Sequence, residues 1–88
     1  MEYSRKVSKE EAENNRVLIL KNLVKKFPPV GTAVICRFDG KSIPAHIIEE
    51  PCTCVGPEKP HFHWYISFDQ DAGLTPGIET KFEVQEQE

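Results

Sequence analysis

Two cysteines and two histidines stand close together near the middle of the chain. Cys52 and Cys54 are two residues apart, and after six intervening residues His61 and His63 repeat the same spacing. Thiolates and imidazoles are ligands that zinc prefers in a tetrahedral site, and residues two apart on a strand project to the same side. Structural zinc sites usually space their paired ligands more widely than this. We therefore expect no cofactor, and zinc held by these four side chains is the alternative.

A second set of reactive side chains falls on one face of the predicted strands. Residues 61–69 alternate in polarity, which places His63 and Tyr65 on the outward face, and His46 faces outward on the preceding strand. Histidine and tyrosine can act as general acids and bases, but no carboxylate stands at a spacing that would orient either imidazole. The sequence also contains no glycine-rich phosphate loop and no nucleophile elbow. We expect this surface, with the neighbouring loop 52–60, to bind a partner and not to catalyse a reaction.

Basic residues supply a different candidate surface. Lys21, Lys25 and Lys26 share one predicted helix, and Arg37 and Lys41 flank a predicted turn. Gathered into one patch, they could neutralise the phosphates of a nucleic acid. The whole chain, however, carries a net charge of −3 and a calculated pI of 5.6, which is atypical of a general nucleic-acid binder. Nucleic-acid binding is therefore an alternative to protein binding and ranks below it.

The first element that positions these groups is a predicted helix over residues 9–27. Ser8 and Glu11 have the spacing of a capping box, and acidic residues in the first turn with lysines in the last turn suit the helix dipole. An apolar stripe recurs at helical spacing at Val17, Leu20, Val24 and Phe27. The two prolines that follow end the helix. Residues 1–7 precede the cap, and we expect them to be disordered.

The region from residue 32 to residue 84 is expected to form strands. Asp39 and Gly40 give the strongest short hairpin signal, because a type I′ turn needs positive φ at both of its central positions. A two-residue turn there sets the register, with Phe38/Lys41, Cys36/Ile43, Val34/Ala45 and Thr32/Ile47 as pairs on one apolar face. Pro44 removes a ladder donor and predicts an edge position or a bulge nearby.

Two further strands follow the hairpin. Residues 61–69 alternate, with Phe62, Trp64, Ile66 and Phe68 predicted to face inward. Residues 78–84 form the last predicted strand, and residues 85–88 form an acidic tail that we expect to be disordered. Cys36 lies on the apolar face of the hairpin and is expected to behave as a small hydrophobic residue.

These elements predict an α+β fold in one domain that spans residues 1–88, since 88 residues suffice for a single core. The amphipathic helix would cover a small antiparallel SH3-like barrel of four or five strands, or alternatively one face of an open curved sheet. The longest apolar run, Val17 to Leu20, is far too short to span a membrane. An odd count of three cysteines favours a reducing compartment, so we expect a cytoplasmic protein with no membrane partner.

Residues 30–84 resemble the strand order of Tudor and chromo-barrel modules. The resemblance rests on Val30-Gly31-Thr32-Ala33-Val34-Ile35-Cys36, on Ala45-His46-Ile47-Ile48 and on Trp64-Tyr65-Ile66-Ser67-Phe68-Asp69. It implies an SH3-like barrel. Because such modules often hold a methylated lysine or arginine in an aromatic cage, it also nominates Phe38, Tyr65 and Phe68 as binding residues. A helix followed by a strand meander is similar to Sm-like barrels as well, which implies RNA as a partner.

Together these observations predict a small, non-enzymatic module that binds another protein. The predicted binding residues are Phe38, His46, His63 and Tyr65. A zinc-stabilised domain that uses the cysteine and histidine pairs is one alternative. A nucleic-acid-binding barrel of the Sm-like or Tudor-like kind is the other. The sequence does not specify the oligomeric state.

Overall fold

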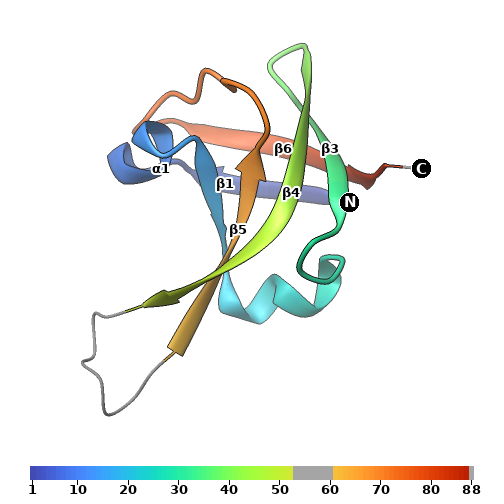
Figure 1. Cartoon of the computed structure of the whole chain (residues 1–88). Coiled ribbons are helices and arrows are strands. Elements are labelled where there is room, and N and C mark those ends of the chain that lie inside the picture. The colour runs from blue at the N-terminus through green and yellow to red at the C-terminus, as the bar shows by residue number, and fades with distance from the viewer. Residues whose placement is uncertain (53–60, 88) are drawn as a thin grey trace.

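A computed structural model describes the backbone of residues 1–52 and 61–87, and the side chains of residues 1–51 and 62–87 (Figure 1). Within these residues six strands form one antiparallel sheet: β1 (Glu2–Lys6), β2 (Arg16–Ile19), β3 (Ala33–Phe38), β4 (Lys41–Cys52), β5 (His61–Phe68) and β6 (Glu79–Glu86). Two short helices separate the early strands, the α-helix α1 (Lys9–Glu13) and the 3₁₀ helix η1 (Lys21–Lys26). The strand order is β1-β6-β3-β4-β5-β2, so β1 and β2 are the two edges of the sheet.

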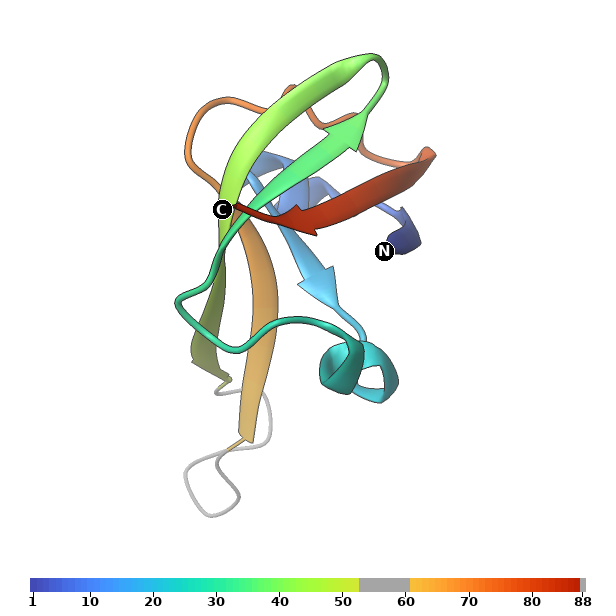
Figure 2. The same ribbon diagram turned by 90° about the vertical axis from the view of Figure 1, so that its right-hand side faces the viewer.

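The sheet curls into a half-barrel around a single apolar core (Figures 1 and 2). Successive side chains of a strand point to opposite faces, and β6 buries every second residue over most of its length. The largest fully buried side chains are Val7, Val17, Val34, Cys36, Ile47, Ile66 and Phe82. Phe82 also packs against Phe38, with 4.9 Å between the ring centroids. The curled sheet therefore encloses its own core, and no long helix is needed to cover it.

The predicted N-terminal amphipathic helix over residues 9–27 is wrong, and so is the predicted α+β class, because the described part of the chain is mostly β, with 53% in strands and 14% in helices. The predicted capping box is present, but it starts a helix of only five residues. Asn15 then adopts a left-handed conformation with φ 53°, which an α-helix does not continue through. The following residues form β2, where Val17 and Ile19 are buried at the two-residue spacing of a strand. Pairing with β5 supplies the hydrogen bonds that a helix would otherwise have made.

Both ends of the chain form strands where the sequence predicted disorder. β1 occupies most of residues 1–7 and pairs with β6, and its Tyr3 is buried. β6 continues to Glu86, beyond the predicted end at residue 84, and the backbone N–H of Gln87 donates to the carbonyl oxygen of Ala33 at 2.9 Å. The expected four or five strands are therefore too few, because β1 lies in the segment predicted to be disordered and β2 in the segment predicted to be helical.

The predicted β3–β4 hairpin is confirmed together with its register. Phe38 pairs with Lys41, and the ladder continues to Ala33 opposite His46. Asp39 and Gly40 both have positive φ, as the predicted turn requires. Pro44 does not mark an edge strand, since β4 lies between β3 and β5.

The missing N–H of Pro44 breaks no ladder bond. The Asp69 N–H donates to the Pro44 carbonyl at 2.8 Å, so the backbone of Pro44 faces β5. Strand β5 itself ends at Phe68, one residue before Asp69. A proline fits this central strand because its ring nitrogen lies just past the end of the neighbouring strand.

Strands β4 and β5 extend beyond the rest of the sheet. The β3–β4 ladder ends at His46, and the β2–β5 ladder ends at Trp64, whereas β4 and β5 stay paired as far as Cys52 opposite His61. Residues 49–52 and 61–64 therefore form a two-stranded arm, which projects away from the half-barrel (Figure 1). Phe62, predicted to face the core, lies on this arm and is 47% exposed.

Candidate functional site

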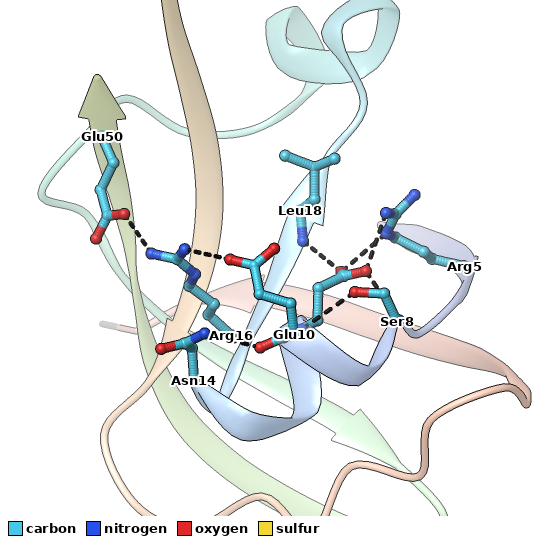
Figure 3. A network of polar contacts seen from close by, with 8 residues as sticks. Arg5, Ser8, Glu10, Asn14, Arg16, Leu18 and Glu50 are labelled. Carbon is cyan, nitrogen blue, oxygen red and sulfur yellow. Dashed lines mark hydrogen bonds and ion pairs between the residues drawn. The ribbon is translucent and has the colours of Figure 1, made fainter. Parts of the chain in front are cut away.

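A buried carboxylate accepts a backbone hydrogen bond from the outer edge of β2, the edge that faces away from β5. Glu11 on α1 is 2% exposed, and its side chain accepts hydrogen bonds from the Leu18 N–H at 2.7 Å and from the Ser8 N–H at 3.0 Å. The Arg5 guanidinium donates to both carboxylate oxygens at 2.9 Å (Figure 3). Burial by itself raises the pKa of Glu11, but the hydrogen bonds from Arg5, Leu18 and Ser8 outweigh it, so the net pKa is lowered. Glu11 is therefore charged and structural.

Tyr3 of β1 also hydrogen-bonds backbone groups on this edge of β2. Its hydroxyl donates to the Leu18 carbonyl at 2.6 Å and accepts from the Leu20 N–H at 3.2 Å. Burial raises the pKa of this phenol, which keeps it protonated and able to donate. Side chains from β1 and α1 thus satisfy both backbone groups of Leu18 and the N–H of Leu20 on the edge of β2 that faces away from β5.

An arginine on β2 ties α1 to the base of the arm. The Arg16 guanidinium donates to Glu10 at 2.9 Å and to Glu50 of β4 (Figure 3). It also lies 4.0 Å from the ring centroid of Tyr65, a distance typical of a cation–π contact. Burial by itself lowers the pKa of Arg16, but the hydrogen bonds to Glu50 and Glu10 outweigh it, so the net pKa is raised and the guanidinium is charged.

The predicted binding residues do not form one exposed cluster. Phe38 is 5% exposed and packs in the core against Phe68 and Phe82, so it cannot line an aromatic cage on the surface. Tyr65 is on the outward face as predicted, yet it is only 9% exposed because Arg16 lies over its ring.

The two histidines remain near the surface. His63 lies beside Tyr65, with 6.5 Å between the ring centroids. His46 is exposed, and its Nδ1 lies 2.7 Å from Oδ1 of Asp69. A carboxylate does therefore orient one imidazole, although it comes from the residue that follows β5 and no local spacing predicted it. Tyr65, the third predicted residue of this surface, is engaged by the Arg16 guanidinium.

The predicted zinc ligands lie mostly outside the described residues. Cys54 is not described, and neither are the side chains of Cys52 and His61. The backbone register places Cys52 opposite His61, and His63 lies opposite Glu50. Among the residues whose side chains are described, no group of three or more histidine, cysteine, aspartate or glutamate side chains could hold a metal ion. The zinc site stays a prediction that metal analysis of the purified protein would decide.

The predicted basic residues are divided between two ends of the molecule. Lys21, Lys25 and Lys26 are on η1 and exposed, whereas Arg37 and Lys41 flank the β3–β4 turn at the opposite end (Figure 1). The Lys41 ammonium also donates to the Ala72 carbonyl at 2.9 Å and so anchors a loop. The structure therefore does not assemble the predicted five-residue basic patch, and η1 is left as a separate cluster of three lysines.

A pocket of about 210 Å³ lies where β2 gives way to η1, against the arm. Its lining residues are Leu18, Ile19, Lys21, Phe62, His63 and Trp64, and we call this site the arm pocket. Typical small-molecule sites start at about 300 Å³, so the arm pocket has the size for one large side chain and not for a drug-sized ligand. Most of its lining is aliphatic or aromatic, and Lys21 places one positive charge at its wall.

A second pocket, of about 310 Å³, lies at the other end of η1. It is lined by Met1, Lys26, Phe27, Pro28, Val84 and Glu86. Phe27 is only 8% exposed, and the lysine and the glutamate bring charges of opposite sign. This pocket therefore lacks the exposed aromatic side chain that distinguishes the arm pocket.

Cys36 is confirmed as a core residue. It is fully buried, and burial raises the pKa of its thiol to about 12. A thiol with that pKa is protonated at neutral pH, and only the thiolate is a good nucleophile. Cys36 is therefore inert.

The arm pocket was not predicted, because half of its lining residues lie on a different element from the one expected. Leu18, Ile19 and Lys21 were placed on one helix, and Phe62 and Trp64 on the core face of a strand. The one signal in this run is that Val17 and Ile19 are β-branched, which weakly favours a strand, while its apolar period fits a helix equally well. No local pattern, however, indicates that β2 ends at Ile19 while β5 continues past it.

Comparison with known proteins found no matching family model, no matching curated protein and no matching solved structure. Among the described residues, no helix is long and apolar enough to cross a membrane.

Proposed function

We propose that this chain is a small, non-enzymatic protein-binding module whose docking site is the arm pocket. The observation that carries the proposal is the exposure of Phe62, which leaves 47% of a large apolar residue in solvent beside a pocket. A partner that covers this side chain would remove apolar surface from water, which is favourable. Aromatic side chains next to a pocket are frequent hot spots of protein interfaces.

The arm pocket is also rigid enough to be a preformed site. Trp64 and Ile19 are partners in the β2–β5 ladder, and Phe62 and His63 are held by the β4–β5 ladder. Arg16 adds contacts to α1 and to Glu50 at the base of the arm. A site built on paired strands loses little conformational entropy when a partner binds.

Selection of short random peptides on the immobilised chain tests the proposal. Peptides that bind are then measured against the wild-type protein and against the Phe62→Ser variant. We expect the variant to lose at least about tenfold in affinity, equal to about 1.4 kcal/mol. Ile78→Ser is the matched control, because Ile78 is 56% exposed and does not line the arm pocket.

Two results contradict the proposal. One is a set of binders whose affinity is the same for wild type, Phe62→Ser and Ile78→Ser. The other is tight binding of a single-stranded oligonucleotide that depends on Phe62 and Lys21 while no peptide binds, since exposed aromatic rings beside lysines also suit nucleic-acid bases.

A further inference from the structure

Strand β5 has an edge that β2 leaves uncovered. The β2–β5 ladder ends with Ile19 opposite Trp64, whereas β5 begins three residues earlier, at His61. The chain turns away at this point because the Leu20 N–H bonds the Tyr3 hydroxyl and the Leu20 carbonyl accepts the Leu23 N–H at 2.8 Å. Among the described residues, none continues the ladder along the arm.

The hydrogen-bonding pattern identifies which backbone groups face this edge. The Phe68 N–H donates to the Asn15 carbonyl at 3.1 Å, so Phe68 faces β2. Backbone groups of an antiparallel strand alternate between its two neighbours, so Ile66, Trp64 and Phe62 face the same side. Ile66 and Trp64 are covered by β2, and the N–H and C=O of Phe62 lie beyond its end. Phe62 thus presents one backbone donor and one acceptor directly beside the arm pocket.

The other edge of the arm is protected against strand addition. The Ile47 N–H donates to the Thr32 carbonyl at 3.1 Å, so Glu49 and Pro51 face outward on that edge by the same alternation. Proline has no N–H to offer, and a charged residue discourages pairing, which are two common ways to protect an exposed edge. The β5 edge of the described arm has neither device at Phe62. The sequence therefore blocks one edge of the arm and leaves open the edge that borders the pocket.

We infer that the partner binds by strand addition: an extended segment continues the line of β2, pairs with the backbone of Phe62 and places an apolar side chain in the arm pocket. This inference rests on the proposed function and adds the conformation and chemistry of the partner. Short peptides often bind exposed sheet edges in this way, with backbone bonds fixing direction and pockets giving specificity.

Charge complementarity gives the second property of the segment. Lys21 lines the pocket, and Lys25 and Lys26 follow it on η1, which has no acidic residue. The chain as a whole has a net charge of −3, so an acidic segment is attracted here by a local cluster and not by the overall charge. The partner segment therefore carries aspartate or glutamate beside its apolar anchor.

The best peptide selected on the wild-type chain serves as the probe. Its affinity is compared for Phe62→Ala, which loses the ring, and Phe62→Pro, which loses the ring and the backbone donor. Prolines at positions 44 and 51 of β4 show that this pair of strands accepts the residue where no ladder bond is broken. We expect Phe62→Pro to bind the peptide about fivefold to tenfold more weakly than Phe62→Ala does. In the wild-type chain, we expect the bound peptide to slow the exchange of the Phe62 amide proton.

Further measurements use only the wild-type chain, so they do not depend on the folding of Phe62→Pro. Methylation of single backbone nitrogens in the peptide should abolish binding at alternate positions, and replacement of its acidic residues by amides should weaken binding by about tenfold. Tolerance of every methylation, with no slowing of Phe62 amide exchange, overturns strand addition but leaves the docking pocket in place. A peptide that binds equally well after neutralisation overturns the acidic segment. A wild-type dimer in which the Phe62 amide is protected overturns a separate partner in favour of a second copy.

Discussion

Two sheet edges lie near η1, and they differ in how their backbone groups are hydrogen-bonded. On the outer edge of β2, the Leu18 N–H, the Leu18 carbonyl and the Leu20 N–H all bond side chains of Glu11 and Tyr3. On the edge of β5, the backbone of Phe62 has no ladder partner among the described residues, and its ring is 47% exposed.

This difference is what we expect if the outer edge of β2 contributes to stability and the edge of β5 contributes to binding. Backbone groups that face the gap between β1 and β2 would be costly to bury unpaired, so side chains from two other elements satisfy them. The arm projects into solvent, where water can satisfy the same groups until a partner arrives. Removing a group from the first edge should therefore cost stability, and removing one from the second should cost binding.

Glu11→Ala should have the largest effect on stability. It leaves Arg5 and two backbone N–H groups without their acceptor in a site where Glu11 is 2% exposed. Loss of one partner of a buried ion pair costs about 3 kcal/mol or more. Urea unfolding followed by circular dichroism would measure the change. Glu13→Ala is the control, because its side chain is 63% exposed and should change the stability by less than about 0.5 kcal/mol.

Tyr3→Phe should have a smaller effect on the same edge. The variant keeps the buried ring and its contact with Phe27, and it removes only the hydroxyl that bonds Leu18 and Leu20. We expect a loss of about 1–2 kcal/mol in the free energy of unfolding, since two backbone groups lose a partner. An unfolding midpoint equal to that of the wild type would show that the hydrogen bonds of the hydroxyl with Leu18 and Leu20 do not stabilise the fold.

Acidification should lower the free energy of unfolding through protonation of Glu11. Its pKa in the folded chain is lowered from the ordinary value of 4.5, so the unfolded state binds the proton more readily. The stabilisation is complete above pH 4.5 and is lost as the pH falls through the lowered folded-state pKa. We expect the free energy of unfolding to fall less steeply with acidification in Glu11→Gln than in the wild type. Parallel curves for the two proteins over this range would contradict the assignment.

Phe62→Ser should have the smallest effect on stability, because it changes only the binding edge. The side chain lies on the exposed arm, and surface substitutions usually change stability by less than about 0.5 kcal/mol. Thermal unfolding of this variant and of Ile78→Ser should give similar midpoints, although only the first loses peptide binding. A drop as large as that of Tyr3→Phe would place Phe62 in the stabilising framework and weaken its role as a docking residue.

Local geometry made part of this molecule predictable. The Asp39-Gly40 turn needs positive φ at two adjacent positions, and that requirement alone fixed the register of β3 against β4. The capping box between Ser8 and Glu11 also formed where its spacing indicated, because both of its hydrogen bonds join residues of a single turn.

The arm pocket could not be predicted in the same way. His63 was identified as a binding residue, and it lines the pocket. Leu18 and Lys21, however, were assigned to a helix, and Phe62 to the core. The pocket depends on where β2 stops relative to β5, which is a property of two segments that are more than forty residues apart in the chain.

The β3–β4 turn, the capping box of α1 and the alternation of buried residues in β3 and β6 follow from the amino-acid sequence, since these features depend on neighbours along the chain. Tertiary structure alone decided the state of the run Val17 to Leu20. Every residue of that run is apolar, so a helical period and a strand period fit it equally well. Pairing with β5 on one side and the hydrogen bonds of Leu18 with Glu11 and Tyr3 on the other favour the strand.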